Sequence, residues 1–298
     1  MAVISNNSII IPPDSRIEQS YGPFYDRSDT YDVIDVGSGS SLTGSYTFSG
    51  VNAEKMVIHE RSNISGFGIF SRIRCRDLEV YQGARIHGPY SFQYCSYINR
   101  VKFYENVIIT GTHAFSCCSM TELLFGKGMN LNGTGIFFSC KNIKHLEIPD
   151  NSNIKGPLIF SQCVNLKTIR FGNNITVEGN RIFSHCDSLE SIYFGNNVSV
   201  YGQENFYGCP NITTIEHGAN FQNEDETLRI FQKPYKRVRF EEIPEGTECS
   251  ILREPFDEQS DIVKTVCGHY FNKDGLDKWV LQNKTCPMCR ENIEKLKN

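Results

Sequence analysis

One stretch near the end of the chain carries residue types that bind metal ions. Residues 267–290 read CGHYFNKDGLDKWVLQNKTCPMCR, which opens with a Cys-x-His pair and closes with a Cys-Pro-Met-Cys pair. Thiolate sulfur and imidazole nitrogen are common ligands of closed structural zinc sites, and such a site contributes directly to the folding of the segment that holds it. The stretch therefore opens and closes like a zinc finger.

The composition is that of a folded protein, because 39% of the 298 residues are hydrophobic. The formal net charge of -4 and the sequence pI near 6.0 argue against a dedicated nucleic-acid binder. The one basic run, residues 233–240, is interpreted as a solvated linker because acidic residues flank it on both sides. No window reaches the roughly 18 apolar residues that a membrane helix needs. We therefore expect neither nucleic acid nor a membrane as a partner.

The twelve cysteines bear on the compartment in which the chain works. A secreted disulfide framework is one explanation, but the regular placement of the cysteines and the CPMC pair favour buried thiols and metal ligands in a reducing compartment. The N-terminus shows no charged leader followed by an apolar segment. We expect an intracellular, cytoplasmic protein.

An internal repeat occupies the first two thirds of the chain. A Gly is followed four residues later by a Phe eight times, and successive Phe residues are 22 or 23 positions apart. Units this small cannot bury an apolar face alone, so they must stack into a solenoid. The glycines are Gly44, Gly66, Gly88, Gly111, Gly133, Gly156, Gly179 and Gly202, and the phenylalanines are Phe48, Phe70, Phe92, Phe115, Phe137, Phe160, Phe183 and Phe206.

Each column of the repeat has an expected role. The glycines indicate a close approach of the backbone to the next coil, where a side chain would obstruct stacking. The phenylalanines should stack in one internal column. A Cys follows each of the last six Phe by three residues, and we interpret it as a small buried hydrophobe, because no His or carboxylate recurs with it as a metal site would require. These cysteines are Cys95, Cys118, Cys140, Cys163, Cys186 and Cys209.

A short apolar alternation follows each Cys and predicts a strand with one buried face. With these landmarks, the repeats resemble the BspA-type leucine-rich repeat over about residues 40–217. The resemblance implies a stack of short strands that serves as a binding surface. We place the substrate on the exposed side of the strands, at residues such as His145, Arg170 and Tyr193, although the sequence does not identify the substrate-binding residues.

From Cys249 onward the chain resembles the RING fingers of ubiquitin ligases, which bind two zinc ions through eight Cys or His ligands. Lined up on that pattern, the eight positions hold Cys249, Leu252, Cys267, His269, Asn272, Gly275, Cys286 and Cys289. The resemblance implies that Cys267, His269, Cys286 and Cys289 complete one site, whereas Cys249 alone survives at the other. We expect one zinc ion per chain, with apolar packing around Leu252 and hydrogen bonds from Asn272 in place of the second.

Four further residues match positions outside the ligand set. In RING fingers the places of Ile251, Trp279 and Pro287 form an apolar groove for the ubiquitin-conjugating enzyme. The place of Arg290 contacts both that enzyme and the ubiquitin it carries. The resemblance implies that no residue of this chain acts as a nucleophile, since the finger holds the thioester-linked ubiquitin in a reactive pose for attack by a substrate lysine.

The sequence thus predicts a RING-type ubiquitin-protein ligase in which the solenoid recruits a protein substrate and the finger activates a ubiquitin-charged conjugating enzyme. Two other classes stay open. One is a non-catalytic interaction scaffold with a structural zinc finger, which a buried Trp279 would favour. The other is an inhibitory pseudo-ligase that binds conjugating enzymes without activating them. RING fingers often pair, so a homodimer is also open.

The predicted fold class is a mainly β solenoid, leucine-rich-repeat-like, of about eight coils of 22–23 residues, plus a small α+β zinc-binding RING-like domain. The predicted parts are an N-terminal cap or lead-in over residues 1–39, the solenoid over residues 40–222, a linker over residues 223–246 and the variant RING finger over residues 247–298.

Overall fold

The computed structural model describes residues 2–26, 29–225, 227–228, 235–265, 267–280, 283, 285–291 and 293. The chain divides into two compact units, Met1–Phe231 and Gln232–Asn298. Each unit has a hydrophobic core of its own. The two units are therefore described separately.

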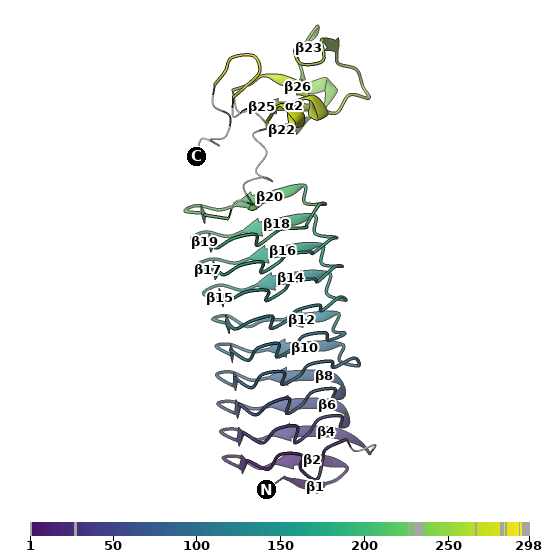
Figure 1. Ribbon diagram of the computed structural model, residues 1–298, viewed down its shortest axis with the longest axis vertical. Coiled ribbons are helices and arrows are strands. Elements are labelled where there is room, and N and C mark those ends of the chain that lie inside the picture. The colour runs from purple at the N-terminus through teal and green to yellow at the C-terminus, as the bar shows by residue number, and fades with distance from the viewer. Residues whose placement is uncertain are drawn as a thin grey trace. The chain divides into compact units, whose positions relative to one another are not determined.

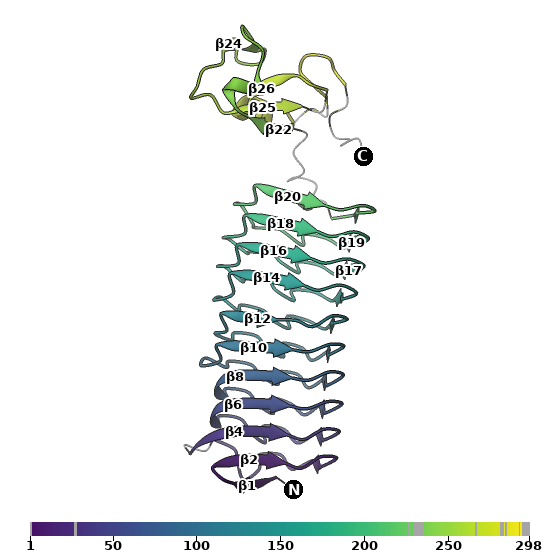
Figure 2. The ribbon, with the colours of Figure 1, turned by 180° about the vertical axis from the view of Figure 1, so that it is seen from behind.

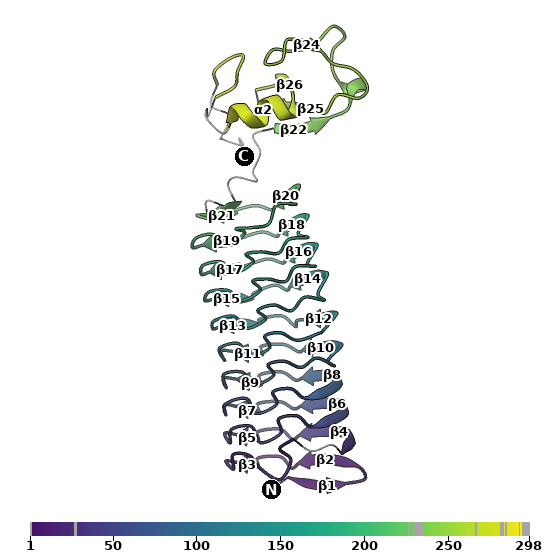
Figure 3. The ribbon, with the colours of Figure 1, turned by 45° about the vertical axis from the view of Figure 1, so that its right-hand side comes forward.

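The first unit is a stack of coils with two columns of strands, which Figure 3 shows side by side. One column holds a seven-stranded sheet: β1 (Val3–Ser5), β2 (Ser8–Ile11), β4 (Thr30–Val36), β6 (Asn52–Ile58), β8 (Arg74–Val80), β10 (Arg100–Phe103) and β12 (Glu122–Leu124). It continues in a four-stranded sheet: β14 (His145–Ile148), β16 (Thr168–Phe171), β18 (Ser191–Phe194) and β20 (Thr214–His217) (Figures 1 and 2).

The other column is one ten-stranded sheet. It contains β3 (Arg16–Ile17), β5 (Ser41–Leu42), β7 (Asn63–Ile64), β9 (Arg85–Ile86), β11 (Ile108–Ile109), β13 (Asn130–Asn132), β15 (Asn153–Lys155), β17 (Ile175–Glu178), β19 (Val198–Tyr201) and β21 (Gln222–Asn223). Strands of successive coils pair in parallel, and equivalent residues face each other across the ladder, as Ile169 does with Ile192. The stack therefore places each repeated residue type in a column of its own.

The phenylalanine column is confirmed. All eight predicted side chains are at most 1% exposed. The ring centroids of successive residues lie 4.7–5.4 Å apart. Phe24 adds a ninth ring, 5.2 Å from that of Phe48. The rings form a continuous aromatic spine along the core.

The glycine column shows the expected close approach of backbones. A Cβ added at Gly156 would lie 2.5 Å from the carbonyl oxygen of Gly133, a separation that real Cβ atoms do not show. A Cβ at Gly66 would lie equally close to the oxygen of Gly44. A side chain at these positions would force the coils apart.

The cysteine column is buried, and each thiol donates to the carbonyl oxygen of the Phe one coil earlier. The S···O distances run from 3.0 Å, between Cys118 and Phe92, to 3.5 Å, between Cys163 and Phe137. Burial raises the pKa of Cys163 to about 12. Such a thiol stays protonated at neutral pH, which suits a packing role and not a reactive one.

The strand columns continue N-terminally of residue 40. Residues 8–36, within the predicted cap or lead-in of residues 1–39, supply β2, β3 and β4 to the same two columns. The repeat pattern did not reveal this coil because Ser20 stands four residues before Phe24, where the later coils have Gly.

The second unit is a small α+β fold. It holds an antiparallel sheet of β22 (Tyr235–Val238), β25 (Ile262–Thr265) and β26 (Tyr270–Asn272), a hairpin of β23 (Glu248–Cys249) and β24 (Glu254–Pro255), the 3-10 turn η1 (Phe240–Glu242) and the helix α2 (Lys273–Val280). No helix in the described part of the chain is long and apolar enough to span a bilayer.

The predicted linker, residues 223–246, includes β22, which pairs with β25 along its whole length. Strand β22 therefore belongs to the sheet of the second unit. Residues 226 and 229–234 lie outside the described residues, and so do the first two residues of the basic run 233–240.

Candidate metal centre

A tight turn between β25 and β26 positions Cys267 and His269. Gly268 has a φ of +90°, in the region that favours glycine, and its N–H donates to the Thr265 carbonyl at 2.9 Å. The Thr265 N–H donates in turn to the His269 carbonyl at 2.9 Å. The Thr265 hydroxyl also lies 3.1 Å from the Cys267 sulfur. Sequence reasoning missed Thr265, because a lone Thr before a Cys carries no pattern of its own.

A second turn positions Cys286 and Cys289. The Arg290 N–H donates to the Cys286 carbonyl at 2.9 Å, and the Cys286 N–H donates to the Glu291 carbonyl at 2.8 Å. The indole N–H of Trp279 donates to the Thr285 carbonyl at 2.7 Å, which ties α2 to the residue before Cys286. Both pairs of ligand residues are thus held by short, hydrogen-bonded turns.

The four predicted ligands come together. One ligand atom each from Cys267, His269, Cys286 and Cys289 lies within 4.8 Å of the others. The Nδ1 atom of His269 lies 3.4 Å from the Cys267 sulfur and 3.5 Å from the Cys286 sulfur. With Zn–S near 2.3 Å and Zn–N near 2.0 Å, a tetrahedral ion separates sulfur and nitrogen ligands by about 3.5 Å. The cluster therefore fits one zinc ion.

The two more buried thiols of the cluster differ in their electrostatics. Burial acts to raise the pKa of Cys267, but hydrogen bonds from Thr265 and His269 outweigh it and lower this pKa to about 7. At Cys286 burial predominates and raises the pKa to about 11. Zinc binds cysteine as the thiolate, so binding would release a proton from Cys286 at neutral pH.

Hydrogen bonds and packing occupy the place that the RING pattern gives to a second ion. The sulfur of the buried Cys249 accepts the N–H of Asn272 at 3.2 Å and that of Leu252 at 3.5 Å. The Asn272 side-chain oxygen accepts the N–H groups of Asp274 at 3.0 Å and Gly275 at 3.4 Å, and so caps α2. The surviving Cys and the substituted Asn therefore have partners without a metal.

The packing at this place differs in detail from the expectation. A Cβ added at Gly275 would lie 3.4 Å from Cγ2 of Ile251 and 3.6 Å from Cδ2 of Leu252, so α2 packs against this loop. Leu252 itself is 43% exposed. It covers one side of the helix and does not form the centre of a buried cluster.

The four residues assigned to the conjugating enzyme are accessible to different degrees. Ile251 and Trp279 are half-buried and pack against the core of the second unit. Pro287 is half-buried and Arg290 is exposed. Gly275, which Ile251 contacts, and Trp279 are one helical turn apart on the same face of α2. Trp279 is not fully buried, so the condition that would favour a purely structural finger is not met.

Comparison with known families covers both units. A family model described as "BspA type Leucine rich repeat region", in six copies, matches residues 24–137 and 133–228, which is more than half of the chain. The chain belongs to the BspA-type leucine-rich repeat family. In this BspA-type protein a second model, "Ring finger domain", matches residues 247–290. The repeats are therefore followed by a RING finger.

Curated relatives of the BspA-type protein are similar to it over little more than the RING finger. The chain is 42% identical over 53 residues to "E3 ubiquitin-protein ligase RNF128" of Xenopus laevis, which is 17% of this chain and 13% of that protein. It is 37% identical over 54 residues to "E3 ubiquitin-protein ligase At1g63170" of Arabidopsis thaliana, covering 18% and 14%. It is 39% identical over 51 residues to "RING-H2 finger protein ATL30" of Arabidopsis thaliana, covering 16% and 18%. The chain thus spans less than a fifth of the length of these relatives.

Among solved structures, a leucine-rich repeat protein from Bacteroides ovatus matches the BspA-type chain with a TM-score of 0.31 and 14% identity. The match covers 75% of this chain and 77% of the other.

Proposed function

We propose that the chain is a RING-type ubiquitin-protein ligase, in which the solenoid recruits a protein substrate and the finger binds and activates a ubiquitin-charged conjugating enzyme. The observation that carries the proposal is the complete four-ligand cluster, flanked by a half-buried Trp279 and an exposed Arg290. The similarity of this region to named E3 ubiquitin-protein ligases supports it.

The proposed metal content is one zinc ion, held by Cys267, His269, Cys286 and Cys289. A zinc ion with three thiolates and one imidazole has no open coordination position, so it supplies folding free energy and no chemistry to the transfer step. The chain's own contribution at this site is to fix the second of the two turns, which presents Pro287 and Arg290.

The proposed role of the finger is to restrict the motion of the ubiquitin thioester. Ile251, Trp279 and Pro287 would bury apolar surface of the conjugating enzyme. The Trp279 indole N–H already donates to Thr285, so its ring can be covered without leaving a buried donor unpaired. The guanidinium of Arg290 would hydrogen-bond to enzyme and ubiquitin together. Holding the thioester in one pose accelerates attack by a lysine of the substrate.

The proposed substrate surface lies on the outer side of the solenoid. His145, Arg170 and Tyr193 line a groove of about 760 Å³ over β14, β16 and β18. The groove begins where the seven-stranded sheet ends at β12 and the four-stranded sheet starts at β14. The Arg170 guanidinium lies 4.1 Å from the centre of the Tyr193 ring, and Leu124 is 37% exposed at one edge. A surface with both apolar and charged groups is suited to a protein ligand.

The test is single-turnover discharge of ubiquitin from a panel of charged conjugating enzymes. The full chain should accelerate discharge, and Trp279→Ala should reduce the acceleration about tenfold while keeping the zinc, because it removes an anchor of the contact and no ligand. Lys278→Ala, at the exposed neighbouring position on α2, is the matched control and should stay active. Binding without acceleration would point to the inhibitory pseudo-ligase, and neither effect on any enzyme would point to the scaffold.

Two further expectations belong to the proposal. We place the activity in the cytoplasm, because all twelve cysteines are free of disulfides, as a reducing compartment requires. We leave a homodimer open, since the finger could pair with a second copy, and sedimentation of the full chain distinguishes a monomer from a dimer.

A further inference from the structure

One corner of every coil carries an outward-facing residue in an unusual backbone conformation. This residue lies two positions after each Phe of the internal column, and its φ is between +49° and +77° in every coil. Glycine adopts this left-handed region freely, whereas other residues lose stability there. The corner residues are Asp26, Gly50, Arg72, Tyr94, Cys117, Ser139, Gln162, His185 and Gly208.

Arg72 and Tyr94 occupy this corner, and no stabilising ion pair or ring contact within the described residues offsets the unfavourable backbone conformation. Arg72 is exposed and Tyr94 is 50% exposed. Within the described ranges, no carboxylate lies at ion-pair distance from Arg72 and no ring packs on Tyr94. At the same corner His185 packs edge-on against Tyr207, with centroids 5.4 Å apart. Two large side chains stand in a position suited to glycine, and the described residues offer them neither an ion pair nor a ring contact, which points to a use outside the chain.

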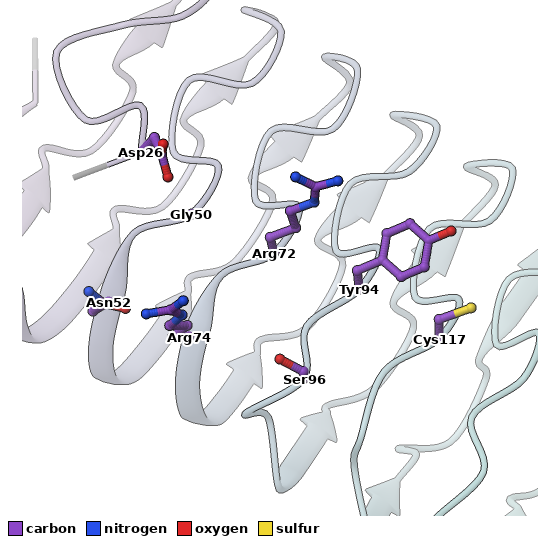
Figure 4. A pocket seen from close by; sticks show the side chains of 8 residues that line it. All are labelled: Asp26, Gly50, Asn52, Arg72, Arg74, Tyr94, Ser96 and Cys117. Atoms are coloured by element: carbon purple, nitrogen blue, oxygen red, sulfur yellow. The ribbon is translucent and has the colours of Figure 1, made fainter. Parts of the chain in front are cut away.

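These two residues face a hollow of about 610 Å³. Figure 4 shows Arg72, Tyr94 and Cys117 projecting from successive coils, with Arg74 at the near end of β8. The hollow lies where the path of the chain between corner and strand becomes longer. Strands β6 and β8 begin directly after the corner residues Gly50 and Arg72, whereas β10 begins several residues after Tyr94, at Arg100. The residues that line it are Asp26, Gly50, Asn52, Arg72, Arg74, Tyr94, Ser96 and Cys117.

A second, smaller hollow of about 330 Å³ shares Arg72 and Tyr94 and is otherwise lined largely by tyrosines. Tyr21 and Tyr25 in it are 60% and 44% exposed. Tyrosine and arginine are the residues that most often dominate the energetics of protein–protein contacts. Because the two hollows share Arg72 and Tyr94, their tyrosine rings and guanidinium groups lie next to each other.

We propose that this surface, the Arg72–Tyr94 hollow, binds an extended segment of a partner protein that carries carboxylate side chains. Charge complementarity identifies the occupant. Arg72 and Arg74 supply two guanidinium groups, and in the described part of the chain neither has a carboxylate at ion-pair distance. Guanidinium groups bind carboxylates through paired hydrogen bonds. The exposed tyrosines would cover the apolar parts of the same segment.

A nucleic acid fits this surface less well than an acidic peptide. Asp26 also lines the hollow and repels anions of either kind, but the carboxylates of a peptide can be spaced to avoid it, whereas a nucleic acid carries a charge at every phosphate. The rings of Tyr21 and Tyr46 are stacked on each other, with centroids 5.3 Å apart, so one face of each is not available to a base. The net charge of -4 opposes a polyanion more strongly than a short segment with a few carboxylates.

The inference goes beyond the proposed ligase activity, because binding here needs only the solenoid. The test is fluorescence anisotropy of the full chain with three labelled ten-residue peptides that alternate Tyr with Glu, Gln or Lys. A labelled 20-nucleotide oligothymidylate is the fourth probe. The Glu peptide should bind most tightly, and its affinity should fall as salt is raised, because exposed charges are screened. Equal binding of the three peptides, or tighter binding of the oligonucleotide, would overturn the proposal.

Glycine substitutions separate binding from folding. Arg72→Gly and Tyr94→Gly remove the side chain where glycine suits the backbone, so both variants should fold. Each should weaken binding of the Glu peptide about tenfold, the typical loss for a charge-assisted contact or an aromatic anchor. Gln162→Gly changes an exposed residue at the same corner, away from the hollow, and should bind as the unmodified chain does. Unchanged binding by both Arg72→Gly and Tyr94→Gly would refute the proposal, whatever the outcome of the ubiquitin-discharge assay.

Discussion

The solenoid and the RING finger build their cores in opposite ways. In the solenoid, the Phe, Gly and Cys positions recur in most coils, and each coil contacts mainly the coil before and after it. In the finger, the one hydrophobic core of eight buried residues includes the ligand Cys286, and the ligand Cys267 packs against it. A repeating core distributes its stability along the stack, whereas a centred core depends on one point. A single core substitution should therefore destabilise only the neighbouring coils of the solenoid. In the finger, loss of one ligand should unfold the whole unit.

The chain offers a spectroscopic separation of the two units. Trp279 is the only tryptophan, and it lies in the finger. Its fluorescence reports on that unit alone, while far-UV circular dichroism is dominated by the strands of the solenoid. Each prediction below uses this separation.

The largest effect should come from removing a ligand of the cluster. Cys286→Ser should release the zinc and unfold the finger, because metal binding supplies about 10 kcal/mol or more to small zinc domains. The Trp279 emission should shift to that of an exposed indole, while the strand signal of the solenoid stays. Chelation of the unmodified chain should give the same result.

The matched control is Cys249→Ala, which removes the one Cys left at the place of the second ion. It leaves two backbone donors without an acceptor, a loss of about 1–3 kcal/mol, but it should keep one zinc per chain. Metal analysis of both variants decides the ion count. Two zinc ions in the unmodified chain would refute the one-site interpretation.

A smaller effect should follow from shortening one ring of the aromatic spine. Phe160 is fully buried and stacks on Phe137 and Phe183. Phe160→Ala should lower the free energy of unfolding of the solenoid by about 3–5 kcal/mol, the range for deleting a buried aromatic side chain. Denaturant titration followed by circular dichroism measures this, and the Trp279 signal should not change. A loss below about 1 kcal/mol would contradict the spine as a packed core.

The smallest effect should be a gain in stability. Gln162 is exposed with a φ of +61°, so Gln162→Gly should relieve the backbone and raise the free energy of unfolding by up to about 1 kcal/mol. The same titration by circular dichroism detects the shift. A decrease would mean that the Gln162 side chain stabilises the coil in a way that the corner geometry does not explain.

Sequence reasoning succeeded where a residue type has one physical use. The Phe, Gly and Cys columns were predictable because the same residue type recurs at one position in most coils, and the four ligands because Cys and His in this spacing point to zinc. The positive φ at the corner of each coil could not be predicted from Arg72, Tyr94 or Gln162. These residue types rarely adopt a positive φ, so their presence does not signal one. Gly50 and Gly208, at the same position in other coils, are the residues whose type favours a positive φ.

Other parts stayed out of reach for different reasons. Strand β22 lies among charged residues, and its pairing with β25 is a contact distant in sequence. The exposure of Leu252 depends on how closely α2 approaches at Gly275, which a sequence pattern does not give. The roles of Ile251, Trp279, Pro287 and Arg290 toward a conjugating enzyme remain predictions.

The parallel pairing between coils also fixes a scale of length. Neighbouring strands lie about 4.8 Å apart, so the six steps from β8 to β20 place Arg74 about 30 Å from the last coil of the stack. Duplicating or deleting one coil between them would change that separation by a single step and leave both ends intact. The distance from a docked segment to the end of the solenoid can therefore change only in steps of one coil, about 4.8 Å each. The number of coils sets this distance.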